Sequence, residues 1–189
     1  MATFTVIYDA NVLYPAPLRS VLMFLAQTDL FRARWTLDIH EEWIRNLLLK
    51  RPDLSQEKLE GLRDMMIDAI PDSLVTGYEP TIDGLILPDP DDRHVLAAAL
   101  RANAEIIVTA NLKDFPAESL MPYNVVAQHP DDFILDLIDL QPPLVLTCFE
   151  EDRTHYRNPP YTVEEYLENL QRQGLSKTVA YLSEYHHLI

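Results

Sequence analysis

Acidic and amide side chains follow two strand-like segments of this 189-residue chain. Asp9 comes directly after TFTVIY (3–8), and Asn111 and Asp114 come shortly after AEIIVTA (104–110). Both segments are short and rich in β-branched residues, which is typical of buried strands. If the two strands are parallel and central, their carboxyl ends lie at one edge of the sheet. We therefore expect these side chains to converge, although they are far apart in the sequence.

Two further acids stand beside predicted helices. Asp92 precedes a helix whose apolar stripe includes Val95 and Leu96, so its carboxylate is expected one turn above the core. Glu42 flanks the apolar stripe around Trp43 rather than lying opposite it. The sequence thus predicts four acids facing one pocket: Asp9, Glu42, Asp92 and Asp114.

Such a cluster points to metal chemistry. Carboxylates gathered within a few ångströms repel one another unless a cation neutralises them. Mg²⁺ and Mn²⁺ prefer oxygen ligands and leave coordination places for water and a substrate phosphate. The predicted reaction is metal-dependent hydrolysis of a phosphodiester by a positioned water.

Each acid also has a purely structural interpretation. Asp9 and Asp92 fit helix-start positions, where a side chain caps backbone N–H groups. Glu42 fits a solvated helix face, and Asn111 and Asp114 fit ordinary turns. The metal site is therefore predicted from the joint placement of these residues and not from any one of them.

The elements that must position these residues alternate between strand and helix. Such alternation predicts a parallel sheet flanked by helices. Strands are predicted at 3–8, 33–37, 73–79, 104–110 and 124–128. Helices are predicted over Leu18–Leu25, from Asp38 to Leu49, over 55–70 with Ser55 as N-cap, after LPDPDD, and over 129–140.

The pattern changes at residue 141. Prolines at 159 and 160 indicate a loop, and Gly174 separates two helical segments, TVEEYLENLQRQG and SKTVAYLSEYHHLI. We predict a domain over 1–140 and a C-terminal helical extension over 141–189.

Composition narrows the protein class. The hydrophobic content of 48% is enough for a packed core, and the single cysteine, Cys148, predicts a reducing compartment. The N-terminus has no leader-like pattern and no window approaches 18 uninterrupted apolar residues, so a cytoplasmic protein without membrane segments is expected. The net charge of −15 argues against a broad, sequence-blind grip on a phosphate backbone.

The order of motifs resembles the PIN-domain family, metal-dependent ribonucleases that include the VapC-type toxins of bacterial toxin–antitoxin pairs. The resemblance covers about residues 3 to 140 and runs through YDANVLYPA, HEEWIRNLL, DPDDRHVLAAAL and IIVTANLKDFP. It implies a three-layer α/β/α domain with a central parallel sheet. It also implies a ribonuclease that takes RNA as substrate and a protein antitoxin that blocks the acidic pocket. The extension lies outside the shared core, and antitoxin docking, formation of a homodimer and stability are the roles open to it.

The resemblance also assigns residues. The four catalytic acids, which are also the metal ligands, are Asp9, Glu42, Asp92 and Asp114, with Glu42 preferred over Glu41 because it directly precedes Trp43. Supporting positions are Asn11, Asp89, Asp91, Thr109 and Asn111, and the side chains placed to contact substrate phosphates are Arg93, His94 and Lys113. Surface solvation is the alternative for these last three.

One departure from the family concerns Asn111, where many members carry an aspartate. The amide removes one negative charge from the pocket. We expect one firmly bound Mg²⁺ or Mn²⁺ ion, with a second arriving with the substrate.

Other classes remain as competing interpretations. A phosphatase of the haloacid dehalogenase type needs a second aspartate two residues after the first, where this chain has Asn11. A phosphate-accepting receiver domain fits poorly for another reason, because its acceptor aspartate follows a middle strand, whereas Asp9 follows the first predicted strand. The non-enzymatic alternative is a degenerate PIN fold that binds RNA or protein without catalysis.

Overall fold

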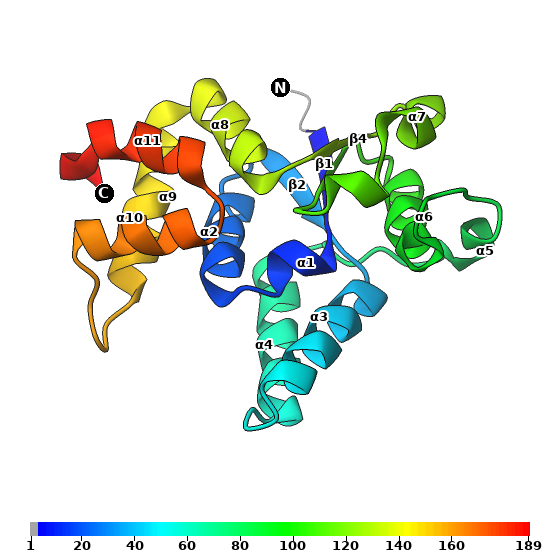
Figure 1. The fold of residues 1–189 in the computed structure, drawn as a ribbon, viewed down its shortest axis with the longest axis horizontal. Helices are drawn as coiled ribbons and strands as arrows, with labels where there is room; N and C mark the ends of the chain where they lie inside the picture. The colour runs from blue at the N-terminus through cyan, green and yellow to red at the C-terminus, as the bar shows by residue number, and fades with distance from the viewer. Residues whose placement is uncertain (1–3) are drawn as a thin grey trace. The chain divides into compact units, whose positions relative to one another are not determined.

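The computed structural model describes residues 4–189, and contacts divide them into two compact units (Figure 1). The first unit covers residues 4–14 and Phe31–His129, and the second covers Pro15–Leu30 and Pro130–Ile189. Thr3, at the start of the first predicted strand, lies outside the described residues. The contacts place residues 130–140 in the second unit, so the predicted boundary after residue 140 stays a prediction.

A four-stranded parallel sheet forms the centre of the first unit. Strand β1 (Phe4–Tyr8) pairs with β2 (Phe31–Arg34) on one side and with β3 (Ile106–Val108) on the other, and β3 pairs with β4 (Val126–Gln128). The strand order is β2-β1-β3-β4, so the direction of winding reverses between β1 and β3. Ligands of open α/β sheets bind at such a reversal, beyond the carboxyl ends of the strands. The predicted parallel α/β fold is confirmed.

One predicted strand is not formed. The segment 73–79 contributes only an isolated bridge, between Leu74 and Trp35. Gly77 has a φ of 74°, a left-handed conformation that glycine adopts without strain. The chain turns there and enters α5 (Glu79–Ile82), so the apolar residues of the segment do not continue as a strand.

Local capping signals fix the helices of the first unit. The Thr36 side chain accepts a hydrogen bond from the Ile39 N–H at 3.1 Å, so β2 ends earlier than the predicted 33–37. Ser55 accepts from the Lys58 N–H, as predicted for an N-cap. The helices are α1 (Ala10–Leu13), α3 (Leu37–Lys50), α4 (Gln56–Ala69), α5, α6 (Arg93–Ala102) and α7 (Ala117–Leu120), with 3-10 turns η1 (Pro90–Asp92), η2 (Leu112–Asp114) and η3 (Met121–Tyr123).

Helix α6 ties the predicted acids to the core. Its residues from Val95 to Ala99 are fully buried, and it contacts both β1 and β3. Asn103 ends the helix in the left-handed conformation, with a φ of 51°, and its N–H bonds back to the Ala99 carbonyl. The start of α6 is thereby held at a fixed place against the two central strands.

The second unit is entirely helical in its described elements. It contains α2 (Ala16–Ala26), α8 (Pro130–Leu140), α9 (Pro142–His155), α10 (Val163–Arg172), α11 (Ser176–Glu184) and the 3-10 turn η4 (His186–Leu188). Helix α9 lies within the predicted helical extension, but no individual helix was predicted over its residues. Its apolar residues fill the first half (PPLVLTCF) and its charged residues the second (EEDRTH), so it lacks the lateral stripe by which helices are recognised.

Two buried carboxylates bond the helices of this unit to one another. Asp131, in α8, accepts from the N–H groups of Lys177 and Thr178 at 2.9 and 2.8 Å and from the Thr178 hydroxyl at 2.7 Å, and so caps α11. Asp152, in α9, accepts from the Tyr166 hydroxyl at 2.6 Å and from the Ser20 hydroxyl. Buried carboxylates are stabilised only by such complete sets of donors.

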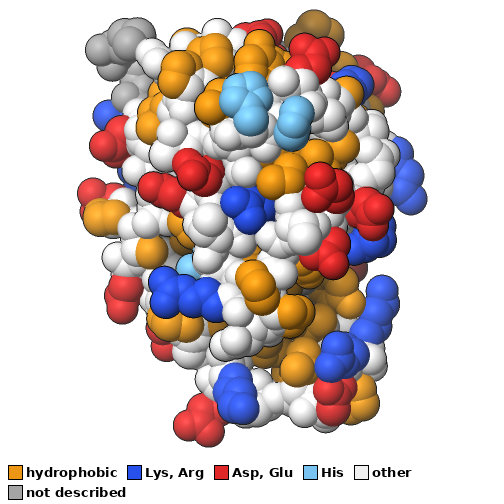
Figure 2. Space-filling view, turned by 90° about the vertical axis from the view of Figure 1, so that its left-hand side faces the viewer, with side chains coloured by type: hydrophobic (Ala, Val, Ile, Leu, Met, Phe, Trp, Pro, Cys, Tyr) orange, Lys and Arg blue, Asp and Glu red, His pale blue; other side chains and the backbone are white. Residues whose placement is uncertain are grey.

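The surface agrees with the acidic composition. On the face drawn in Figure 2, Lys and Arg side chains are interspersed with Asp and Glu instead of forming one basic strip. Within residues 4–189, the helices are too short or too polar for any of them to cross a bilayer.

Candidate active site

Asp9 is held rigidly at the exit of β1. Its backbone N–H donates to the Val108 carbonyl at 3.1 Å, which extends the pairing of β1 with β3 by one residue. One carboxylate oxygen, Oδ1, accepts from the Ala10 N–H at 2.7 Å, so Asp9 does cap α1. The other oxygen, Oδ2, takes no part in this cap and is held by hydrogen bonds from Asn11 and Thr109. Capping α1 therefore uses only one of the two carboxylate oxygens, and the capping and metal interpretations of this acid are compatible.

A side-chain network joins the exits of β1 and β3. The Thr109 hydroxyl donates to Asp9 Oδ2 at 2.8 Å, and the Asn11 amide donates to the same oxygen at 2.5 Å and to Thr109 Oγ1 at 2.9 Å. The Ala110 N–H donates to Asn11 Oδ1 at 2.9 Å. Asn11 and Thr109 therefore fix the orientation of the Asp9 carboxylate.

Asp9 is only 3% exposed, and this changes its acidity. Its pKa is raised to about 6, chiefly by burial. The charge of Glu42 also raises the pKa, whereas the hydrogen bonds from Thr109 and Ala10 and the charge of His94 lower it. Burial therefore outweighs the hydrogen bonds that favour the charged form.

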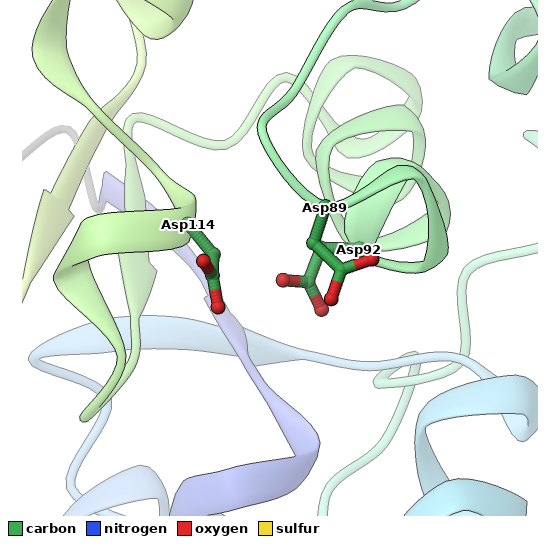
Figure 3. Close-up of side chains that lie close together, drawn as sticks. All are labelled: Asp89, Asp92 and Asp114. Atoms are coloured by element: carbon green, nitrogen blue, oxygen red, sulfur yellow. The ribbon is translucent and has the colours of Figure 1, made fainter.

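Three aspartates form the tightest carboxylate group in the described part of the chain. Asp89, Asp92 and Asp114 each offer an oxygen, and these oxygens lie within 4.8 Å of one another. Figure 3 shows that Asp89 and Asp92 come from the start of η1 and α6, and that Asp114 faces them from η2. Asp89 also caps η1 by accepting from the Asp91 N–H at 2.9 Å.

Repulsion in this group is visible in the acidity of Asp92. Its pKa is raised to about 7, first by burial and then by the charges of four carboxylates: those of Asp9, Asp89, Asp114 and Glu42. All four lie near enough to matter, so the acids predicted from separate parts of the sequence do gather around Asp92.

Asn111 explains how Asp114 is aimed. Its side-chain amide donates to Asp114 Oδ2, and its backbone N–H donates to Thr109 Oγ1 at 3.0 Å. An aspartate at position 111 has no side-chain N–H to donate and would repel Asp114. Asn111 therefore supplies one negative charge fewer than an aspartate would at this position. In exchange, its amide donates a hydrogen bond that orients the Asp114 carboxylate.

Glu42 approaches the group from α3 and is paired with His94. Glu42 Oε2 lies 3.4 Å from His94 Nε2. Burial of the ring lowers the pKa of His94, but the hydrogen bond and the charge of Glu42 outweigh burial, so the pKa is raised overall. The other ring nitrogen, Nδ1, is buried without a hydrogen-bond partner among the described residues.

The remaining predicted residues are Asp91, Lys113 and Arg93. Among the described residues, no hydrogen bond or ion pair joins their side chains to the carboxylate group. Asp91 is exposed, and its backbone, not its carboxylate, contacts Asp89. Lys113 is exposed on η2. Arg93 is half-buried, and its Nε atom is buried with no partner in the described structure.

The oxygens of Asp89, Asp92 and Asp114 fit a hard divalent cation. Such ions take carboxylate ligands and keep further coordination places for water and phosphate. Burial and then the neighbouring carboxylate charges raise the pKa of Asp92, and a bound cation would offset both by stabilising the ionised carboxylate.

Asp89 was predicted as a supporting position, and its oxygen belongs to the close group. Asp9 and Glu42 are near enough to raise the pKa of Asp92 but contribute no oxygen to that group. The spacing of Asp89 and Asp92 was the available signal, since residues three apart on a helical turn lie on one side. The catalytic roles themselves stay predictions.

The fold and this edge define the class: an α/β protein with carboxylates gathered where the winding of a parallel sheet reverses. The family model described as PIN domain matches residues 5–113, and the chain belongs to the PIN-domain family. A second model, described as VapC50 C-terminal domain, matches residues 130–184.

A curated relative carries the same VapC50 name as the second family model. The protein named "Putative ribonuclease VapC50" from Mycobacterium tuberculosis is 48% identical over 82 residues, which are 43% of this chain and 48% of that protein. The chain thus spans about half the length of the curated relative it matches. No solved structure matches this chain.

Proposed function

We propose that this protein is an endoribonuclease that hydrolyses RNA phosphodiester bonds with Mg²⁺ or Mn²⁺, and that it is the toxin of a type II toxin–antitoxin pair. The observation that carries the proposal is the convergence of Asp89, Asp92 and Asp114 at the sheet edge of a PIN-domain chain. The similarity to a relative named as a ribonuclease supports it.

The proposed roles follow from the contacts. A bound cation supplies Lewis-acid activation of the phosphate and of the attacking water. Asp92 and Asp114 hold the cation together with Asp89. Asp9, fixed by hydrogen bonds, and Glu42 complete the acidic wall that orients the water. Because Asn111 is neutral, we propose one firmly bound ion, with a second arriving with the substrate.

Basic neighbours of the acids are proposed to meet the substrate. Arg93 directly follows Asp92 in the sequence and Lys113 directly precedes Asp114, and we propose that both contact RNA phosphates. His94 faces Glu42, so its proposed contact with substrate rests on the sequence alone. The proposals of a blocking antitoxin, a homodimer and a cytoplasmic location rest on family resemblance.

The test compares wild type with Asp92→Asn for cleavage of a mixed RNA pool, with Mg²⁺ and with EDTA. Wild type should cleave only with the divalent ion, and Asp92→Asn should lose cleavage by about a hundredfold or more. Expression of wild type, but not of the variant, should arrest growth.

Asp68→Asn is the matched control, since it makes the same chemical change at an exposed position of α4. It should cleave like wild type. Cleavage that survives in Asp92→Asn, or that proceeds equally in EDTA, would remove the proposed function and favour a non-catalytic scaffold.

A further inference from the structure

A hollow of about 310 Å³ opens beside the candidate active site. It lies between α1 with its C-cap and one face of α3. Two of the residues that line it, Asn11 and Glu42, belong to the candidate site, and the hollow therefore continues from that site. The other side chains used below are Tyr14, Asn46, Leu49 and Lys50.

The α3 residues in this lining share one helix face. Glu42, Asn46, Leu49 and Lys50 are spaced at intervals of four, seven and eight residues from the first, the spacing of neighbours on a single side of a helix. Leu49 is 77% exposed, and Asn46 and Lys50 are exposed as well. An acid, an amide, an apolar side chain and a cation are thus presented together to solvent.

Lys50 is positioned by an aromatic ring instead of an acid. Its Nζ lies 5.3 Å from the centroid of the Tyr14 ring, within the range of a cation–π contact. The ion pairs found between described residues involve other cations, among them Arg51 with Asp53 and Arg63 with Asp64. In a chain of net charge −15, this ammonium keeps its capacity to bind an anion next to the acidic site.

We propose that this hollow binds a nucleotide of single-stranded RNA adjacent to the scissile phosphate. Lys50 contacts a backbone phosphate, Tyr14 and Leu49 provide an apolar surface for the base, and the Asn46 amide bonds to the base edge. Unstacked bases of RNA are recognised by this combination of cation, ring and amide. The inference rests on the proposed function, because it assigns a substrate position to the same site.

Other occupants fit less well. A second hollow on α3, lined by Glu41, Arg45 and Gln56 among others, shares no residue with the candidate site and has its own acids and bases. An acidic segment of a protein partner matches the charge of Lys50, but it brings no base to lie on Tyr14 and Leu49 and no base edge for the Asn46 amide. RNA is favoured because its neighbouring phosphate reaches the cation-binding acids from this hollow.

The test measures RNA binding apart from cleavage. A fluorescently labelled, short single-stranded RNA of mixed sequence is titrated with Asp92→Asn protein in Mg²⁺ over a series of KCl concentrations, and Lys50→Ala is added to that background. One lost phosphate contact lowers the slope of log affinity against log salt by about 0.7 and weakens binding about fivefold at about 0.1 M salt. In the cleaving protein, Lys50→Ala should raise KM by a similar factor and leave kcat unchanged.

Two further variants separate charge from stacking. Lys58→Ala removes an equal charge from α4, away from the hollow, and should bind like its parent. Tyr14→Leu should weaken binding with an unchanged salt slope, whereas Tyr14→Phe should retain it, since a ring still supports the base and the ammonium.

The outcomes distinguish the two proposals. Suppose that wild type cleaves RNA while Lys50→Ala matches Lys58→Ala in affinity and salt slope. That result overturns the inference and leaves the proposed function standing, and it holds even if a protein partner occupies the hollow. A loss of kcat alone in Lys50→Ala also overturns it. If wild type neither binds nor cleaves RNA, both proposals fail.

Discussion

The repulsion within the acidic group predicts that Asp92→Asn stabilises the metal-free protein. The carboxylate oxygens of Asp89, Asp92 and Asp114 lie within 4.8 Å of one another. At that separation two charges repel by about 0.9 kcal/mol in water and about 3.5 kcal/mol at an effective dielectric constant of 20. Because Asp92 is only half-buried, solvent screens much of this, and we expect a gain of about 1–2 kcal/mol.

The raised pKa of Asp92 determines how the stability of the metal-free protein changes with pH. The pKa of Asp92 rises from 3.8 to about 7 on folding, so between these values the folded state keeps a proton that the unfolded state has lost. The contribution of Asp92 to the stability of the metal-free wild type is therefore highest below about pH 4 and falls as the pH rises to about 7. The variant Asp92→Asn has no titrating group at this position, so it lacks this fall, and its advantage over wild type grows across the same window.

Thermal unfolding followed by circular dichroism measures the prediction. In EDTA at about pH 8, Asp92→Asn should melt about 2–8 °C above wild type, since 1 kcal/mol shifts the melting temperature of a chain of this size by about 2–4 °C. The difference should nearly vanish at about pH 4. Asp68→Asn, the exposed control on α4, should show no such pH-dependent gain.

Divalent cations should reverse the order. A ligand at about a hundred times its dissociation constant stabilises the folded state by about 2.7 kcal/mol, and wild type should gain this while Asp92→Asn gains less. If Asp92→Asn melts below wild type in EDTA at about pH 8, or if its advantage is the same at about pH 4, the reasoning from clustered carboxylates is refuted.

Two further predictions concern other hydrogen bonds. Thr109→Val removes the hydroxyl that donates to Asp9 and accepts from the Asn111 N–H. The pKa of Asp9 should therefore rise above about 6, and the free energy of unfolding should fall by about 1–3 kcal/mol. Carboxyl NMR titration and urea unfolding test this, and an unchanged Asp9 titration would contradict it. Asp131→Ala leaves the first turn of α11 without its cap and should lower the free energy of unfolding, measured in urea, by about 2–4 kcal/mol. Asp131→Asn should lose less, because its amide oxygen still accepts hydrogen bonds. Equal losses in the two variants would show that the accepted hydrogen bonds are not the cause.

The sequence by itself determined the strands and most helices that carry the site. The β-rich segments ending at Asp9 and before Asn111 became neighbouring parallel strands, because buried apolar runs and turn residues are local signals. Ser55 capped its helix as predicted for the same reason. The failures were local conflicts as well: Gly77 turned a β-rich segment away from the sheet, and α9 lacked a lateral apolar stripe.

Only the tertiary structure decided how the acids share their tasks. Distances between side chains of different elements depend on how those elements pack, and no spacing in the sequence encodes them. Packing brought Asp114 to the local pair of Asp89 and Asp92, and it set Glu42 against His94. It also turned Asn111 from a missing charge into a donor that aims Asp114, since that bond exists only when the loop after β3 takes its folded shape.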